Sequence, residues 1–109
     1  MNLVGASNVD SREVDEALVM RSSFIVDFRP SAMAHTGELR AAAEALGVAT
    51  ARHIRAEIGE VLNATSVGRQ SAEKVTVYQS LGIAAQDLAT AYAVYERAQR
   101  AGIGTKASF

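Results

Sequence analysis

The stretch that decides the fold is Thr76-Val77-Tyr78-Gln79-Ser80-Leu81-Gly82-Ile83-Ala84-Ala85-Gln86-Asp87-Leu88. Its first three residues are β-branched or aromatic, so they favour a strand. Gly82 allows a sharp turn, and from Ile83 the sequence keeps helical spacing to about Ala101. The stretch therefore predicts a strand, a tight turn and a long helix. Such a joint brings Ser80 and backbone N–H groups to the start of a helix, where ligands are often held.

The composition limits the class of protein. The chain has 109 residues, which suits one small domain or a piece of a larger one. Its 11 basic and 12 acidic residues are mixed, which does not favour a nucleic-acid partner. Because cysteine is absent, thiol catalysis, disulfides and cysteine-ligated metals are excluded. No apolar run reaches membrane-spanning length and no signal peptide is visible, so we expect no membrane partner and a cytoplasmic location.

The first half of the chain carries clear signals for strands and short helices. Asn2 to Ala6 is predicted to be the end of a strand. Asp15 can cap a helix that runs through Arg21. Phe24 to Val26 reads as a buried strand closed by Asp27. Pro30 suits the first position of a short helix that ends near His35.

Helices dominate the predictions that follow. Glu38 to Leu46 is alanine-rich, and Gly47 can end that helix as a C-cap. Apolar residues at spacings of three and four predict another helix within Thr50 to Asn63, where Gly59 would allow close packing. Thr65 to Glu73 is expected to be a loop, and Thr105 to Phe109 a final edge strand. The long helix places an apolar stripe on one side, made of Ala84, Leu88, Ala91, Tyr92, Tyr95 and Ala98, with both tyrosines interpreted as core aromatics.

Alternation of strands and helices indicates an α/β fold. Only two or three core strands are convincing, and a complete doubly wound sheet needs more. The Gly-rich dinucleotide fingerprint, with its acidic residue downstream, is absent from these 109 residues. The sequence therefore reads as the end of a cofactor-binding fold without its beginning.

Three stretches together resemble the ornithine cyclodeaminase and mu-crystallin family of NAD(P)-dependent enzymes. They are Val4-Gly5-Ala6-Ser7 with Arg12-Glu13-Val14-Asp15, then Ala56-Glu57-Ile58-Gly59-Glu60-Val61-Leu62 with Gly68-Arg69, and finally Ser80-Leu81-Gly82 with Gln86-Asp87 and Gly102-Ile103-Gly104-Thr105-Lys106. Their order and spacing extend over nearly the whole chain. The match covers about the last third of a family chain, so the phosphate loop and the substrate-binding Arg and Lys would lie outside these residues.

The resemblance implies a division of the chain. Residues 1–75 would form the C-terminal half of a Rossmann-like NAD(P)-binding domain. Residues 76–109 would supply the crossover strand, long helix and short terminal strand that return to a substrate and dimerisation domain. The implied cofactor is NAD or NADP, and the substrate a small amino acid or imine. As a truncated chain it would lack activity alone; the alternative is a non-catalytic module that self-associates or pairs with another chain.

The resemblance also implies roles for single residues. Val4, Gly5, Ala6, Ser7 and Ser80 would contact the cofactor, and Leu81 would face the substrate. Ser7 stands at the catalytic Asp position of cyclodeaminases, and a hydroxyl cannot replace a carboxylate base near neutral pH. Imine reduction, as in ketimine reductases, therefore fits better than ornithine cyclisation. Ser11 stands where cyclodeaminases have a cofactor-contacting Lys, which puts that contact in doubt. Gln79 stands where many members have Lys, and the resemblance assigns no effect to this departure.

Each candidate also has a purely structural interpretation. Ser7 could bond its own backbone, and Ser80 could be a helix cap. Asp87 could be a catalytic carboxylate, but an acidic residue in the first helix turns more often serves the helix dipole. Glu57 and Glu60 lack further ligands at metal-binding spacing, so a solvated helix face is favoured and no metal is expected. Arg52 and Arg55 are interpreted as a solvated helix face rather than a phosphate clamp. His35 and His53 are expected to have surface or capping roles.

Overall fold

The computed structural model describes residues 1–47 and 49–107 and contains a four-stranded parallel sheet. The strands are β1 (Asn2–Leu3), β2 (Ser23–Val26), β3 (Ile54–Glu57) and β4 (Thr76–Gln79). They lie in the order β1-β4-β2-β3, and each neighbouring pair is parallel. The strand of the deciding stretch, β4, therefore lies inside the sheet between β1 and β2. The predicted α/β class is confirmed, with one strand more than the clear signals indicated.

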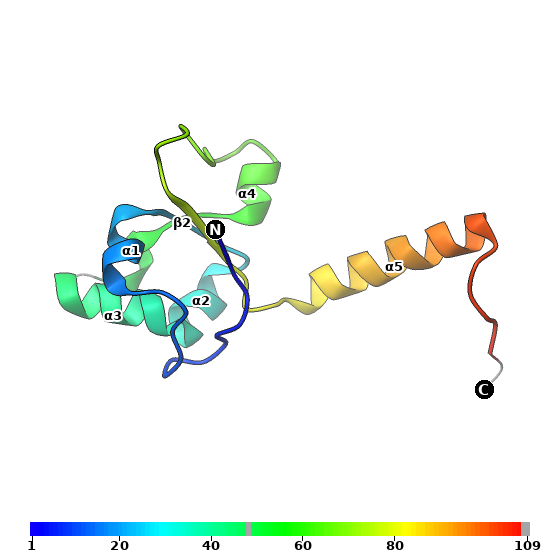
Figure 1. The fold of residues 1–109 in the computed structure, drawn as a ribbon, viewed down its shortest axis with the longest axis horizontal. Coiled ribbons are helices and arrows are strands. Elements are labelled where there is room, and N and C mark those ends of the chain that lie inside the picture. Colours follow the sequence, from blue (N-terminus) through cyan, green and yellow to red (C-terminus); the bar gives the residue numbers. More distant parts are fainter. Residues whose placement is uncertain (48, 108–109) are drawn as a thin grey trace.

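Three helices pack on one face of the sheet and close the core. They are α1 (Glu16–Arg21), α2 (Arg29–His35) and α3 (Gly37–Leu46), which Figure 1 shows grouped on one side. The core consists of apolar side chains from these helices and from all four strands: Leu3, Val19, Phe24, Val26, Ala32, Leu39, Ala42, Ile54 and Val77. A short helix, α4 (Ile58–Leu62), follows β3 directly. This packing fixes the strand ends from which the candidate site is built.

Local capping signals predicted several of these boundaries correctly. The Asp15 carboxylate accepts a hydrogen bond of 2.8 Å from the backbone N–H of Leu18 and so caps α1. Pro30 lies in the first turn of α2, where its missing N–H costs no helical hydrogen bond. Gly47 ends α3 in the left-handed conformation, with φ of 64°.

The helix predicted within Thr50 to Asn63 is confirmed only for its last part, and it is wrong for the residues before Ile58. That segment contains the 3-10 turn η1 (Thr50–His53), strand β3 and the short helix α4. Ile54 and Ala56 are buried and Arg55 between them is exposed, which is the two-residue period of a strand. Pairing with β2 outweighs the helical preference of alanine here.

The expected close packing at Gly59 is also absent. A Cβ added at this glycine would meet no atom of the described residues within 4 Å. Gly59 therefore lies in open space in the first turn of α4. The loop predicted over Thr65 to Glu73 is confirmed, because those residues contain no helix or strand.

The turn and long helix of the deciding stretch are confirmed. Gly82 adopts a positive φ of 84°, and α5 (Ala84–Ala101) follows. Figure 1 shows α5 projecting away from the sheet and the other helices. The Cα radius of gyration is 17.2 Å, whereas a compact chain of this length has about 13 Å. The elongated shape is the direct consequence of this projecting helix.

The apolar stripe of α5 is not covered by any part of the chain that the structure describes. No residue of the helix is buried, and Leu88 is 73% exposed. Tyr92 and Tyr95 are exposed as well. Their interpretation as core aromatics is therefore wrong, because the stripe has no partner surface among residues 1–47 and 49–107.

The last residues differ from the predicted edge strand. Residues 105–107 form no strand, while Ser108 and Phe109 lie outside the described residues. None of the helices within the described ranges has the length and apolar character needed to cross a membrane.

Candidate functional site at the carboxyl edge of the sheet

The carboxyl ends of the parallel strands meet at one edge of the sheet, here called the carboxyl edge. In open α/β sheets, ligands bind outside this edge. β1 and β4 are neighbours, with Leu3 opposite Gln79, and the N–H of Ser80 donates a 3.0 Å bond to the carbonyl of Leu3. The segments Val4–Ser7 and Ser80–Gly82 therefore leave the sheet side by side. The two segments that the sequence assigned to cofactor and substrate thus begin next to each other at the carboxyl edge.

Asp27 holds the joint between β4 and α5. Its Oδ2 accepts hydrogen bonds from the Ser80 hydroxyl at 3.1 Å and from the backbone N–H groups of Leu81 and Gly82, both at 2.8 Å. Its Oδ1 accepts from the N–H of Phe28 at 2.7 Å. Asp27 is only 5% exposed. Four donors on one nearly buried carboxylate fix where the Ser80 and Leu81 side chains begin.

Sequence reasoning gave Asp27 no role beyond ending β2. A signal was present, because an acidic residue directly after a buried apolar strand lies at the carboxyl edge of a parallel sheet. The structure also excludes the interpretation of Ser80 as a helix cap, since α5 has Ile83 at its N-cap and no side-chain cap bond. Asp87 lies in the first turn of α5, where its charge suits the helix dipole.

Glu13 holds the other segment of the site. Its Oε2 accepts hydrogen bonds from the backbone N–H groups of Gly5 at 3.0 Å and Ala6 at 3.2 Å. A Cβ added at Gly5 would lie 3.0 Å from Oε1 of Glu13, so the glycine leaves room for this carboxylate. The middle of the Val4–Ser7 segment is therefore held by a side chain seven to eight positions away in sequence.

A buried carboxylate connects the two segments. Glu38 is fully buried in α3, and its Oε1 accepts a 2.7 Å bond from the N–H of Glu13. Its Oε2 accepts a 3.2 Å bond from Nε2 of Gln79, the last residue of β4. The Oε1 of Gln79 is buried and has no hydrogen-bond partner among the described residues. Many members of the family that the sequence resembles have Lys at the position of Gln79. Here the Gln79 amide contacts the Glu38 carboxylate instead.

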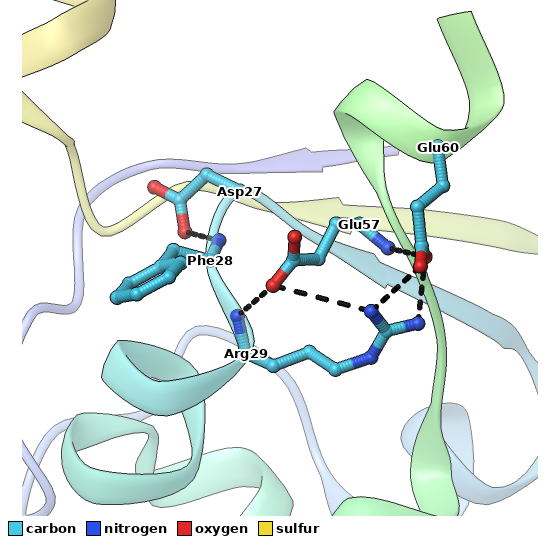
Figure 2. A network of polar contacts seen from close by, with 5 residues as sticks. All are labelled: Asp27, Phe28, Arg29, Glu57 and Glu60. Atoms are coloured by element: carbon cyan, nitrogen blue, oxygen red, sulfur yellow. Dashed lines mark hydrogen bonds and ion pairs between the residues drawn. The ribbon is translucent and has the colours of Figure 1, made fainter. Parts of the chain in front are cut away.

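A second polar network ties the ends of β2 and β3 (Figure 2). The N–H of Arg29 donates to Glu57 at 2.7 Å, and its guanidinium binds Glu60 through two bonds of 3.0 and 2.7 Å. The N–H of Glu57 donates to Glu60 at 2.8 Å, completing a capping box at α4. Glu57 and Glu60 therefore form a structural network rather than the solvated helix face predicted.

The charges of this network stabilise one another. The hydrogen bond from Arg29 holds the pKa of Glu60 below its ordinary value of 4.5, and the N–H of Glu57 adds to the effect. The same bond to Glu60 raises the pKa of Arg29, against an opposing effect of burial. Both groups are therefore charged at neutral pH.

The remaining candidates differ in exposure, and Ala6 is buried, with 8% of the residue exposed. Val4 is 72% exposed, and Ser7 is exposed without a side-chain hydrogen bond to any described residue. Ser7 therefore does not bond its own backbone. Ser11 is half-buried in the following turn, where its N–H donates to the carbonyl of Asn8.

The donor set of the carboxyl edge determines what it can hold. The N–H groups of Gly5, Ala6, Leu81 and Gly82 all donate to Glu13 or Asp27. These segments contain no Lys or Arg. A pyrophosphate needs free hydrogen-bond donors or cations. These N–H groups already donate to two carboxylates, so the carboxyl edge does not suit a pyrophosphate. The exposed Val4 side chain and the hydroxyls of Ser7 and Ser80 suit a planar group with an amide, such as a nicotinamide.

Known proteins resemble this chain over most of its length. The profile described as the ornithine cyclodeaminase/mu-crystallin family matches residues 1–102. Alanine dehydrogenase of Archaeoglobus fulgidus is 35% identical over 109 residues, which are 100% of this chain and 33% of that protein. Ketimine reductase mu-crystallin of Mus musculus is 35% identical over 96 residues, covering 88% of this chain and 28% of that protein.

A solved structure shares the fold. Thermococcus litoralis Δ1-pyrroline-2-carboxylate reductase, in complex with NADH and L-proline, superposes with a TM-score of 0.81 at 30% identity. The match covers 97% of this chain and 32% of that one. The chain thus spans about a third of the length of the relatives it matches.

Proposed function

Because this chain belongs to the ornithine cyclodeaminase/mu-crystallin family, we propose that it supplies the C-terminal part of an NAD(P)-dependent enzyme acting on amino-acid-derived imines. One observation carries the proposal. The segments Val4–Ser7 and Ser80–Gly82 lie side by side at the carboxyl edge, each held by a carboxylate from elsewhere in the chain. Two relatives with matching sequence or fold are named as reductases of a ketimine and of a pyrroline carboxylate.

The residues of the chain position the reactants. When bound, NAD(P) supplies or accepts the hydride, and the protein sets orientation and excludes water. Val4, the Ser7 hydroxyl and Ser80 would hold the nicotinamide. Leu81 presents an apolar side chain to the substrate. Asp27 and Glu13 keep these groups in place by accepting the N–H bonds of both segments.

Ser7 decides between two reactions of the family. A carboxylate at this position could act as a general base, whereas a serine hydroxyl near neutral pH can only orient water, substrate or cofactor. We therefore propose imine reduction, or amino-acid oxidation through an imine, rather than ornithine cyclisation with loss of ammonia. The name of the mouse relative, ketimine reductase, supports this choice.

The proposal also assigns the two parts of the chain to different domains. Residues 1–75 belong to the cofactor domain, and residues 76–109 lead from it toward a substrate and dimerisation domain. The projection of α5 away from the sheet supports this division (Figure 1). β4 itself pairs with β1 and β2, so the departure begins after Gln79.

The 109 residues alone are proposed to be inactive, because they lack the Gly-rich fingerprint and the pyrophosphate donors. The test follows NADH and NADPH fluorescence with Δ1-pyrroline-2-carboxylate as substrate and the purified chain as catalyst. We expect no oxidation of the reduced cofactor above the buffer rate. Turnover by the chain would refute the proposed inactivity and would show that the site is complete without further residues.

A second candidate function is a non-catalytic module that self-associates through α5. The exposed stripe with Leu88, Tyr92 and Tyr95 favours it, because a monomer leaves these side chains in water. Sedimentation over a range of protein concentrations distinguishes the two candidates. A stable dimer that the Leu88→Glu variant dissociates supports the module, and a monomer at high concentration rejects it.

A further inference from the structure

A hollow of about 370 Å³ lies at the opposite, amino-terminal edge of the sheet. Its walls come from residues that precede or begin three strands: Ser22 and Ser23 at β2, Arg52, His53 and Arg55 at β3, and Lys74 before β4. The carboxyl edge, with Asp27 and Ser80, lies at the other ends of the same strands. The hollow is therefore separate from the proposed cofactor site.

The hollow is lined by cations without counter-charges. Arg52, Arg55 and Lys74 line it, and no acidic side chain does. Their side chains form no ion pair or hydrogen bond with any residue in the described ranges, whereas Arg12, Arg29, Arg40 and Arg100 all pair with carboxylates. Three uncompensated positive charges around one concavity attract anions.

The structure explains why the sequence did not reveal this cluster. Arg52 and Arg55 were interpreted as one face of a helix, but Arg52 lies in η1 and Arg55 in β3. Lys74 joins them through the parallel arrangement of β2, β3 and β4. The formal net charge of the chain is -1, so the cluster is a local feature and not part of a generally basic surface.

His53 adds a second, independent observation. Its Nε2 is buried and has no hydrogen-bond partner among the described residues. Buried polar atoms normally have partners, because leaving one unpaired costs free energy. His53 also lines the hollow, so the wall contains an unpaired polar nitrogen beside the three cations.

We propose that this hollow binds a small phosphorylated metabolite through its phosphate group. Guanidinium groups of Arg52 and Arg55 match phosphate oxygens in paired geometry, and the Lys74 ammonium adds a point charge. The volume is at the lower end of the range for small-molecule sites, so it suits a compact phosphate ester or diphosphate rather than a polymer. The proposal does not depend on the function of the carboxyl edge.

The test uses inorganic pyrophosphate as probe and follows backbone amide signals of the whole chain by NMR, at constant ionic strength set with chloride. Saturable shifts are expected at Ser23, His53, Arg55 and Lys74. Arg55→Gln and Lys74→Gln should each weaken binding by at least about tenfold, because each removes a charged hydrogen bond. Both side chains belong to exposed residues, so both variants should keep the wild-type spectrum elsewhere.

Arg97→Gln is the matched control, because Arg97 lies on α5 far from the hollow and also lacks an ion pair among the described residues. It should bind pyrophosphate as the wild type does. The proposal is overturned if all three variants lose affinity equally, if shifts spread over every basic surface, or if no saturable shift occurs. Shifts at Gly5 and Ser80 instead would place the anion at the carboxyl edge and would also reject the proposal.

Discussion

The Asp27 carboxylate accepts a 2.8 Å hydrogen bond from the backbone N–H of Leu81, a residue 54 positions later in the chain. This contact joins the end of β2 to the turn between β4 and α5. It fixes the two residues, Ser80 and Leu81, that are proposed to face nicotinamide and substrate. The position of the site thus depends on a residue that itself need not touch either ligand.

Asp27→Asn should loosen this joint. The amide has one acceptor oxygen where the carboxylate uses two, and it places an NH2 group near donors. We expect the free energy of unfolding to fall by about 1–3 kcal/mol. Amide exchange at Leu81 and Gly82 should become faster. Asp10→Asn is the control, because the Asp10 side chain is 88% exposed, and exchange at Leu81 that is equal in both variants would contradict the role of Asp27.

Glu13→Ala tests the other segment. It removes the acceptor of the Gly5 and Ala6 N–H groups, so their hydrogen exchange should accelerate and stability should fall by about 1–3 kcal/mol. Glu16→Ala is the comparison, because Glu16 only makes an exposed pair with Arg12 and should cost less than about 1 kcal/mol. Unchanged protection of Gly5 in Glu13→Ala would show that the segment is held by other contacts.

The Arg29–Glu60 pair predicts a dependence of stability on pH. The pKa of Glu60 is lower in the folded chain than its ordinary value of 4.5, mainly because Arg29 donates to it. The folded state therefore binds fewer protons than the unfolded state in that range. The Arg29–Glu60 pair therefore stabilises the folded chain fully above pH 4.5. This contribution is lost as the pH falls through the lowered pKa of Glu60.

Arg29→Gln should reduce this loss, measured by denaturant unfolding between pH 3 and pH 7. The pKa of Glu73 is also lowered, through its own backbone N–H and the Ser71 hydroxyl, so part of the pH dependence should persist. Arg97→Gln should keep the complete wild-type profile. Identical profiles for Arg29→Gln and the wild type would reject the assigned cause.

Replacement of two glycines by alanine should change the free energy of unfolding in opposite directions. Gly59→Ala adds a Cβ in open space within a helix, so stability should rise by about 0.5–1 kcal/mol. Gly37→Ala brings a Cβ within 2.5 Å of the Ser11 carbonyl oxygen and 2.8 Å of that of Val9, so stability should fall by about 1–3 kcal/mol. Thermal unfolding of both variants checks the signs, and destabilisation by Gly59→Ala would restore the close-packing interpretation.

The parts of the fold that the sequence predicted are those with local causes. β-branched residues define β4, Gly82 defines the turn, and Asp15 and Gly47 define helix ends. β3 was missed because its buried residues are Ile54 and Ala56, and alanine gives no strand signal. Only the neighbouring strand β2 makes the segment extended.

The candidate site stays a prediction, and the residues that support its two segments were not predicted. Val4–Ser7 and Ser80–Leu81 followed from family resemblance, and the parallel pairing of β1 and β4 places them together. Asp27 and Glu38 act through contacts 54 and 41 residues apart in sequence, and no local pattern indicates such partners. The environment of α5 could not be predicted because its stripe has no partner among the described residues.

We propose that the carboxyl edge is the nicotinamide side of a cofactor site. The most direct measurement is an NMR titration with NADH in the Arg55→Gln background, which weakens anion binding in the hollow lined by Arg52, Arg55 and Lys74. Weak but saturable shifts are expected at the amides of Gly5, Ala6, Ser7, Ser80 and Leu81, and they should become smaller when Asp27→Asn is added. No saturable shift at these five residues at millimolar NADH would overturn the proposal.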